Sequence, residues 1–255
     1  MILITGASSG IGEACARAFA ADKRSLLLVA RRKERLDRLG DELRQQHGIE
    51  CASFGLDVRD RPALEAWAKT NASLLSRVTV LINSAGLARG REAIQDGKLE
   101  DWDEMIDTNV KALLHMTKLV LPFLLARQDG KGTPIGHIIN LGSVAGRWAY
   151  PAGNVYAASK FAINGLSQGM RLDLLGTGVK VTEILPGMVE TEFSNVRFRD
   201  DRKAKAAYAG MTPLTGADVA EAIRWAVNLP AHVQIHEIVL TSSDQASAAN
   251  VFRRT

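Results

Sequence analysis

The chain has 255 residues, of which 46% are hydrophobic and 24% are charged, and its formal net charge at pH 7 is +4. This is the composition of a globular protein, and it excludes a disordered chain. The basic residues are spread along the sequence instead of forming the clusters that nucleic acids require, so we expect no nucleic-acid partner.

The cysteines and the apolar segments give no sign of metal binding, secretion or membrane insertion. Cys15 and Cys51 lie far apart, without the spacing of metal ligands, and their number is typical of a reducing compartment. The first residues, MILITG, lack the positive charge that begins a signal peptide. The longest apolar stretch contains Lys118 and Pro122 and is too short and too polar to span a bilayer. We therefore expect a soluble, cytoplasmic protein without a metal or a membrane partner.

Short apolar runs alternate with longer amphipathic segments along the whole chain. Most runs are continuously apolar, as in strands of a parallel sheet that helices cover on both faces. The intervening segments are long enough for right-handed crossovers. These features predict one α/β domain over residues 1–255, with a doubly wound, seven-stranded parallel sheet. The predicted strands are Met1–Thr5, Ser25–Ala30, Cys51–Leu56, Val78–Asn83, His137–Gly142, Val179–Leu185 and His236–Leu240.

Two segments do not fit this alternation. Asp129–Pro134 is rich in glycine and is predicted to form a surface turn that ends a long helix. Asn195–Gly216 is polar and interrupts the pattern, so we predict a loop or lid at about residues 190–215. We refer to residues 190–215 as the lid segment.

The first predicted strand runs directly into the sequence TGASSGIG, in which Gly6, Gly10 and Gly12 precede an alanine-rich helix. One glycine allows the tight turn, one lets the backbone approach a pyrophosphate, and one lets the helix pack closely on the sheet. The free N–H groups at the start of the helix attract phosphates. A glycine-rich turn without a ligand has a similar composition, but this place between strand and helix favours a dinucleotide site.

The end of the second predicted strand indicates which dinucleotide binds. About 20 residues beyond the glycines, an NAD site has an acidic residue that binds the ribose hydroxyls. This chain has Ala30, Arg31 and Arg32 there instead. A guanidinium binds a 2′-phosphate that a carboxylate would repel, and Ser8 or Ser9 could add a hydroxyl. We therefore predict NADP(H), although one of the two arginines could simply begin an exposed basic helix.

Tyr156 and Lys160 stand four residues apart, so both side chains project from one face of a predicted helix. A free tyrosine has a pKa of about 10 and is a poor base at neutral pH. A nearby ammonium and an oxidised nicotinamide both favour the phenolate. To lower the pKa of the phenol by about 2–3 units, they must stabilise the phenolate relative to the phenol by roughly 3–4 kcal/mol. Tyr156 could then exchange a proton with an alcohol or carbonyl oxygen. A packed tyrosine and an unrelated surface lysine would give the same pattern.

Two further residues are candidates for this site. Ser143 follows a predicted strand at the edge where ligands bind in such sheets, and its hydroxyl could hold the reacting oxygen or cap a turn. Asn109 lies in a helix predicted to bury Ile106, Val110 and Leu113, and a buried amide must find partners. Asn109 could bind a water that reaches the lysine, or it could bond only to the backbone.

With these motifs in this order, the sequence resembles the short-chain dehydrogenase/reductase family over nearly its whole length. The resemblance rests on TGASSGIG, NSAG, LPGMVET and the residues Asn109, Ser143, Tyr156 and Lys160. It implies a single-domain Rossmann fold, in which these four residues form a catalytic tetrad and Lys160 also binds the nicotinamide ribose. Ser84 is a departure, because the family usually has a second asparagine there.

The resemblance also implies contacts with the rest of the cofactor. Asp57 would meet the adenine, Asn83 would lie near the adenosine, and Val189 and Thr191 would contact the carboxamide. The complete predicted cofactor site is Gly6, Ser8, Ser9, Gly10, Ile11, Gly12, Arg31, Arg32, Asp57, Val58, Asn83, Ala85, Gly86, Tyr156, Lys160, Pro186, Gly187, Val189 and Thr191.

A closer resemblance, in MIDTN, GNVYAASK, TEFSNVRF and LPAHVQIHEI, is to NADP-dependent 3-hydroxy acid dehydrogenases. That group oxidises serine and L-allo-threonine and reduces malonic semialdehyde. We therefore predict hydride transfer between NADP(H) and a small 3-hydroxy acid. The carboxylate of such a substrate needs a cation, and Arg197 is favoured because it lies in TEFSNVRF. The other candidates for the substrate pocket are Arg147, Arg199, Arg89 and Arg91, with Tyr150 and Trp148 as narrowing side chains, although Trp148 could instead pack in the core.

Two other functions are compatible with the sequence. The same residues could reduce a 3-oxoacyl thioester or a bulkier ketone, or the protein could bind NADPH as a regulatory module without turnover. The resemblance also implies a homotetramer or homodimer assembled through the helices that contain Asn109 and Tyr156. Ala157, Ala158 and Ala162 would permit close helix–helix approach there.

Overall fold

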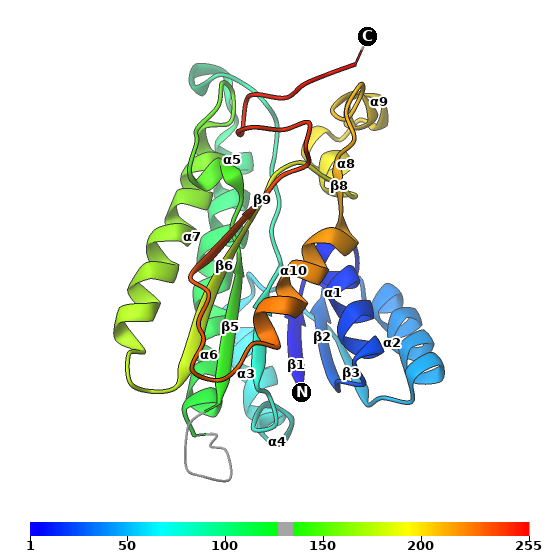
Figure 1. Ribbon diagram of the computed structural model, residues 1–255, viewed down its shortest axis with the longest axis vertical. Coiled ribbons are helices and arrows are strands. Elements are labelled where there is room, and N and C mark those ends of the chain that lie inside the picture. Colours follow the sequence, from blue (N-terminus) through cyan, green and yellow to red (C-terminus); the bar gives the residue numbers. More distant parts are fainter. Residues whose placement is uncertain (127–134, 255) are drawn as a thin grey trace.

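Seven parallel strands form the central sheet within residues 1–126 and 135–254, which are the residues that the computed structural model describes. Their order is β3-β2-β1-β4-β5-β6-β9 (Figure 1), which confirms the predicted doubly wound sheet. Every predicted strand is present, with ends that differ by at most two residues. The turn predicted for Asp129–Pro134 lies outside the described residues. The strands are β1 (Ile2–Thr5), β2 (Leu26–Ala30), β3 (Cys51–Gly55), β4 (Val80–Asn83), β5 (Gly136–Leu141), β6 (Val179–Pro186) and β9 (Glu237–Leu240).

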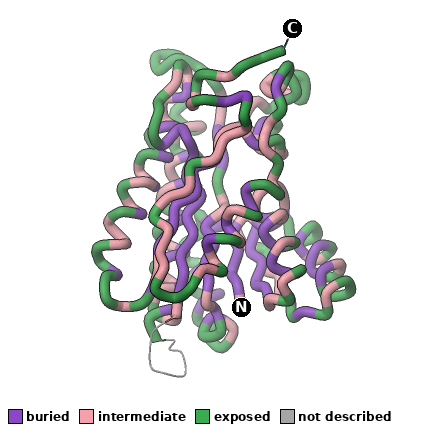
Figure 2. The backbone as a smooth tube through the Cα atoms, viewed as in Figure 1, coloured by how far each residue is buried: buried purple, intermediate pink, exposed green. Residues whose placement is uncertain are grey.

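Helices cover both faces of the sheet (Figure 1). Because side chains alternate along a strand, Ile2 and Ile4 of β1 belong to the core on one face and Leu3 to the core on the other. Figure 2 shows the buried residues concentrated along the strands and on the inner sides of the helices. One face is covered by α1 (Gly10–Ala21), α2 (Lys33–His47) and α10 (Gly216–Val227), and the other by α3 (Arg61–Thr70), α6 (Ala112–Ala126) and α7 (Asn154–Asp173).

The helix that includes Asn109 is irregular where the sequence pattern predicted a regular one. It consists of α5 (Leu99–Ile106), the π-helical turn η2 (Asp107–Lys111) and α6. A π-helical turn contains an extra residue and therefore rotates the helix face. As a result, Ile106 and Val110 are only half-buried, whereas Asn109 is buried.

This combined helix, Leu99–Ala126, is the one helix in the described part of the chain that could cross a membrane by length and composition. In the structure it lies against the sheet. Met116, Val120 and Leu124 are buried in the core on that face. Its apolar composition is thus explained by its packing within the fold.

The lid segment is helical and not the predicted loop. It contains α8 (Phe193–Phe198) and α9 (Asp201–Ala206), which stand beyond the carboxyl ends of the strands (upper part of Figure 1). The side chain of Asp200 caps α9 by accepting hydrogen bonds from two backbone N–H groups. Both helices have only six residues, and α9 is mostly exposed, so they lack the apolar periodicity that identifies a helix in sequence. The other short elements are α4 (Ala72–Leu75), η1 (Ile94–Asp96), η3 (Val144–Gly146), β7 (Val189–Glu190) and β8 (Leu214–Thr215).

The sheet order determines where a ligand can bind. β1 and β4 are neighbours at the centre of the sheet. After β1 the chain goes to β2 on one side of this pair, and after β4 it goes to β5 on the other side, so the two loops diverge. Ligands bind in such sheets in the crevice outside the carboxyl ends of the strands at this point. The glycine turn after β1 and the NSAG segment after β4 both lie there.

His137 of β5 makes the stability of the fold sensitive to acid. Its ring is buried, with Nε2 2.8 Å from Thr182 Oγ1, and burial lowers the pKa of His137 to about 3. An unfolded histidine has a pKa of about 6.5, so between these values the unfolded state binds a proton that the folded state does not. The free energy of unfolding should therefore fall with decreasing pH in this window, by up to about 1.4 kcal/mol per pH unit from this residue.

We predict that His137→Asn flattens this dependence. The measurement is chemical denaturation between about pH 6.5 and about pH 4.5, a range above the titration of most carboxylates. His232→Asn, at an exposed position, is the matched control and should leave the slope unchanged. An unaltered slope in the His137 variant would contradict the prediction.

Candidate functional site

A cleft of about 320 Å³ opens at the carboxyl ends of the strands. It is walled by the loops after β1 to β6 and by the start of the lid segment. Its lining includes most of the residues predicted from sequence, which are Gly6, Ser8, Ser9, Gly10, Ile11, Arg31, Arg32, Asp57, Val58, Ala85, Gly86, Ser143, Tyr156, Lys160, Pro186, Gly187, Val189 and Thr191.

The glycine turn has the close backbone packing that a pyrophosphate site requires. Gly6 has φ +68°, and a Cβ atom there would lie 2.9 Å from the backbone of Ala85. A Cβ on Gly12 would lie 2.5 Å from the carbonyl oxygen of Gly6, so Gly12 supports the turn from behind and does not line the cleft. Ser9 precedes α1 without capping it through its side chain. The first N–H groups of α1 thus face the cleft where phosphates would bind.

The predicted phosphate cation, Arg32, lies among hydroxyl groups at the mouth of the cleft. Its Nε is 3.2 Å from Ser8 Oγ, and its Nη2 is 2.6 Å from Ser9 Oγ. Its Nη1 donates to Glu192 at 2.7 Å, and Arg35 donates to the other carboxylate oxygen at 2.6 Å. Arg32 and Arg35 share the single carboxylate of Glu192, so the net charge of the three side chains is positive. This positive charge, with two serine hydroxyls beside Arg32, fits a 2′-phosphate.

The proposed tetrad residues Ser143, Tyr156 and Lys160 meet at the inner end of the cleft. Lys160 Nζ lies 5.8 Å from the centroid of the Tyr156 ring and donates to the carbonyl oxygen of Leu141 at 2.8 Å. Ser143 follows β5 and caps η3 by accepting a hydrogen bond from the N–H of Ala145 at 3.1 Å. The Ser143 hydroxyl also donates to the carbonyl oxygen of Pro186 at 3.5 Å.

The electrostatics of Tyr156 differ from the expectation. Burial raises the pKa of Tyr156, while the hydrogen bond with Ser143 and the charge of Arg197 oppose this rise. Burial also lowers the pKa of Lys160 to about 8, and the carboxylate of Glu183 opposes that change. The ammonium is directed at Leu141 and not at the phenol, so Lys160 alone does not generate a phenolate.

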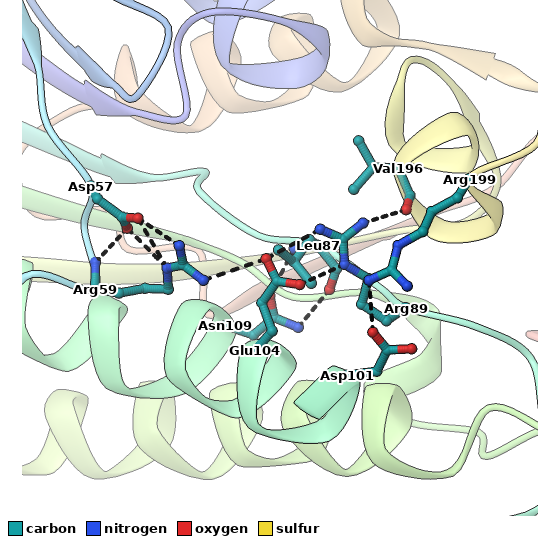
Figure 3. Close-up of polar contacts among 9 residues, drawn as sticks. All are labelled: Asp57, Arg59, Leu87, Arg89, Asp101, Glu104, Asn109, Val196 and Arg199. Atoms are coloured by element: carbon teal, nitrogen blue, oxygen red, sulfur yellow. Dashed lines mark hydrogen bonds and ion pairs between the residues drawn. The ribbon is translucent and has the colours of Figure 1, made fainter. Parts of the chain in front are cut away.

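The side chain of Asn109 holds the loop after β4 and does not line the cleft (Figure 3). Its Oδ1 accepts from the N–H of Leu87 at 2.8 Å, and its Nδ2 donates to the Leu87 carbonyl at 2.9 Å and to Ser159 Oγ at 3.0 Å. These bonds correspond to the structural alternative for this side chain. Asn83 is likewise turned away from the cleft, because its Nδ2 donates to Thr117 and Asn140 in the core.

Ion pairs anchor α8 to α5 above the cleft (Figure 3). Arg89 contacts both carboxylate oxygens of Glu104, at 2.6 and 3.1 Å, and donates to the carbonyl oxygen of Val196 at 2.6 Å. Arg199 pairs with Asp101 at 2.8 Å. Arg89 and Arg199 therefore hold the lid segment in place and do not provide cations for a substrate.

The same network reaches the adenine end of the cleft. Asp57 is bound by Arg59, with the closest N–O distance 2.6 Å, and Arg59 lies 3.4 Å from Glu104 (Figure 3). The hydrogen bond from Arg59 is the largest cause of the lowered pKa of Asp57. Arg59, Glu192 and Arg35 were not predicted from sequence. The partners of Glu192 and Arg35 come from distant segments, whereas Arg59 lies two residues from Asp57. Arg35 lies three residues after Arg32 on α2, and this spacing was an available signal.

Among the arginines proposed for a substrate carboxylate, Arg197 is the one beside Tyr156. Its guanidinium carbon lies 5.6 Å from the centroids of both the Tyr156 and Tyr150 rings. Its Nε donates to the carbonyl oxygen of Gly90 at 3.0 Å. Arg197 does not line the cleft itself but a smaller cavity, which Tyr156 also lines. Within the described residues, the two terminal amino groups of Arg197 form no hydrogen bond, so they can donate to an anion.

The other proposed pocket residues lie elsewhere. Arg147 pairs with Glu237 of β9 and does not line the cleft, so the structure does not support it as a substrate cation. Arg91 does not line the cleft either. Trp148 is 43% exposed and so neither packs in the core nor narrows the pocket. Both Arg147 and Trp148 follow η3 on its outer side, although they are close to Ser143 in sequence.

Comparisons with known proteins agree with this geometry. A model of the family described as short chain dehydrogenase matches residues 1–202. The NADP-dependent 3-hydroxy acid dehydrogenase YdfG of Escherichia coli is 44% identical over 257 residues, covering 100% of both chains. Sulfoacetaldehyde reductase 2 of Chromohalobacter salexigens is 45% identical over 250 residues, which are 98% of this chain and 96% of that protein.

Solved structures give the same result. The closed form of serine dehydrogenase complexed with NADP+ has a TM-score of 0.89 and 42% identity, and the match covers 100% of this chain and 99% of that one. The two chains therefore share one fold over their whole length. Together with the glycine turn and the cleft, these similarities show that the chain belongs to the short-chain dehydrogenase family.

Proposed function

We propose that this NADP-dependent oxidoreductase transfers hydride between the nicotinamide and a small 3-hydroxy acid, with reduction of the semialdehyde as the reverse reaction. The observation that supports this substrate class is the position of Arg197 beside Tyr156, with terminal amino groups available to an anion. A carboxylate bound there would place the adjacent carbon chain close to the phenol. A cation at this short distance favours small substrates with an anionic end.

The named relatives support an anionic group at a fixed distance from the reacting carbon. A 3-hydroxy acid and the alcohol form of sulfoacetaldehyde both have one carbon between the carbinol carbon and the atom that bears the anionic oxygens. Relatives that act on these two compounds, by their names, are 44% and 45% identical to this chain. Arg197 would serve a carboxylate or a sulfonate equally, because both accept charge-assisted hydrogen bonds.

In the proposed mechanism, Ser143 Oγ holds the reacting oxygen of the substrate by a hydrogen bond. Tyr156 accepts the hydroxyl proton during oxidation and returns a proton to the carbonyl oxygen during reduction. Bound NADP(H) supplies the acceptor or donor of the hydride. Lys160 keeps a positive charge beside the phenol, which favours its deprotonated form, and Asn109 fixes the loop after β4 that forms the cleft wall.

The first experiment follows nicotinamide absorbance with NADP and NAD in parallel. The substrates are L-serine, L-allo-threonine, 3-hydroxypropionate, 3-hydroxyisobutyrate and 2-hydroxyethanesulfonate. Turnover with NADP on at least one of them would support the proposal. Faster reduction of a 3-oxoacyl thioester or a bulky ketone than of any semialdehyde would overturn the substrate assignment while leaving the cofactor assignment intact.

We predict that Tyr156→Phe abolishes most turnover because it removes the hydroxyl that transfers the proton. General acid–base groups contribute about 10²–10⁴-fold, and kcat should fall by this amount. The dissociation constant of NADPH, measured by fluorescence titration, should change little. A variant with wild-type kcat would show that another group transfers the proton.

Arg197→Met should reduce kcat/KM for 3-hydroxypropionate about 10- to 100-fold, which is the effect of losing a hydrogen bond to a charged group. Most of the change should appear in KM. Oxidation of an uncharged short alcohol should be unaffected, because it has no anion to bind. Arg147→Met is the matched control, since Arg147 is paired with Glu237 outside the cleft. An equal loss with charged and uncharged substrates would contradict the proposed role of Arg197.

We further propose that the protein forms a homodimer or homotetramer through α6 and α7. Large apolar side chains are exposed on these helices and just beyond α7, and an apolar surface of this kind indicates a partner. They are Leu114, Leu125, Phe161, Leu172 and Leu175.

We predict that the double substitution Leu172→Glu with Leu175→Glu weakens the assembly, because it places like charges in the apolar contact. Sedimentation velocity should show a shift to smaller species. The control Leu99→Glu alters an exposed leucine of α5, at the other end of the molecule (Figure 1), and should leave the assembly unchanged. A wild-type protein that sediments as a monomer would contradict the prediction.

A further inference from the structure

Lys160 carries its charge inside the protein. The residue is 6% exposed, and its Nζ has one hydrogen-bond acceptor within the described residues, the carbonyl oxygen of Leu141 at 2.8 Å. An ammonium has three donors, and burying it costs several kcal/mol unless an opposite charge lies nearby. The fold must therefore provide a counter-charge if Lys160 is to remain protonated.

The buried carboxylate of Glu183 on β6 lies against the same part of the chain. Glu183 is fully buried, and its Oε2 accepts a hydrogen bond from Asn164 Nδ2 at 2.8 Å. Asn164 is four residues after Lys160, so both side chains lie on the face of α7 that covers β6. The proposed mechanism gives Glu183 no role.

The other carboxylate oxygen of Glu183 is directed toward the backbone beside the tetrad. Oε1 has no hydrogen-bond partner in the described part of the chain. It lies where a Cβ of Gly142 would be only 2.2 Å away. Gly142 stands between Leu141, whose carbonyl binds Lys160, and the tetrad residue Ser143. Glycine at this position thus leaves room for the carboxylate directly behind the site.

The charged groups around Glu183 are largely paired with another carboxylate. Arg147, after η3, pairs with Glu237 of β9, and Arg171 of α7 lies 3.9 Å from the same residue. Glu237 also accepts from Asn164 Nδ2, at 3.0 Å. Glu237 can balance only one of the two arginines, so Glu183 is the carboxylate that remains for Lys160 and for the other arginine.

The pKa changes agree with this arrangement. Burial raises the pKa of Glu183, and the hydrogen bond from Asn164 and the charges of Lys160, Arg171 and Arg147 oppose the rise. Glu183 is in turn the charge that opposes the lowering of the pKa of Lys160. Each buried group therefore favours the ionised form of the other.

We infer that Glu183 is a positioning residue of the catalytic site, whose buried carboxylate keeps Lys160 in its ammonium form. This inference rests on the proposed role of Lys160 beside Tyr156. Without the carboxylate, the neutral amine is favoured and Lys160 releases its proton at a lower pH. Tyr156 then loses the positive charge that favours its deprotonated form, so activity declines at a lower pH than in the wild type.

The test is the pH dependence of kcat for oxidation, from about pH 6 to about pH 10, in Glu183→Gln. The alkaline decline should move to lower pH by about one unit, a tenfold change in the fraction of charged lysine at a given pH. Glu183→Asp retains a carboxylate and should restore most of the wild-type profile. Glu237→Gln alters the other acceptor of Asn164 and also unpairs Arg147 and Arg171, but it keeps Glu183, the charge that acts on Lys160, so it should move the decline less than Glu183→Gln does.

Two results would overturn the inference. One is an alkaline decline of kcat in Glu183→Gln at the same pH as in the wild type. The other is a decline in Glu237→Gln that moves to lower pH by as much as in Glu183→Gln, which would indicate a structural effect through Asn164. If Glu183→Gln does not fold, NMR titration of the Lys160 Cε signal in the wild type, assigned with Lys160→Arg, replaces it. A lysine already neutral at about pH 7 would then contradict the inference. Failure of the proposed function is distinct, since it would appear in the wild-type protein as no turnover of any 3-hydroxy acid, and failure of the proposed proton transfer would appear as full activity in Tyr156→Phe.

Discussion

The ammonium of Lys160 is bound inside the protein by the carbonyl oxygen of Leu141, the last residue of β5. This contact lies at the carboxyl end of β5, directly before Gly142 and Ser143. It fixes α7 across the carboxyl edge of the sheet and thereby sets the position of Tyr156, one turn earlier in the helix. A buried charge has few alternative partners, so the contact defines one geometry for the site.

The cleft above this contact is assembled from two halves that are stabilised differently. Backbone packing forms the cofactor side, where the glycine turn approaches the segment after β4 too closely for any side chain. Ion pairs form the substrate side, where Arg89 links α5 to α8 through Glu104 and the carbonyl of Val196 (Figure 3). The first half is rigid and suits a constant cofactor, whereas the second can vary its side chains with the substrate.

Arginines lie near both ends of the cleft, but the two groups of arginines fit different anions. Arginines at the outer end, around Arg32, fit a phosphate group, and Arg197 at the inner end fits a small anion beside the phenol. Glu192 and Phe193 are adjacent in sequence and connect the ends, because Glu192 contacts Arg32 while the Phe193 ring lies 5.7 Å from that of Tyr156. The start of the lid segment therefore contacts the proposed sites for cofactor and substrate together.

The sequence by itself determined the seven strands and the glycine turn, because these depend on local periodicity and on residues close together in the chain. Only the tertiary structure decided the partners of the long polar side chains. Arg147 and Arg197 were both candidates by sequence, with Arg197 favoured by its motif, and in the structure Arg147 pairs with Glu237 whereas Arg197 lies over Tyr156. Asn83 turned into the core, and the end of α8 pairs with α5 through Arg199 and Asp101. Such outcomes depend on segments about 40 to 100 residues apart, whose proximity no local pattern encodes.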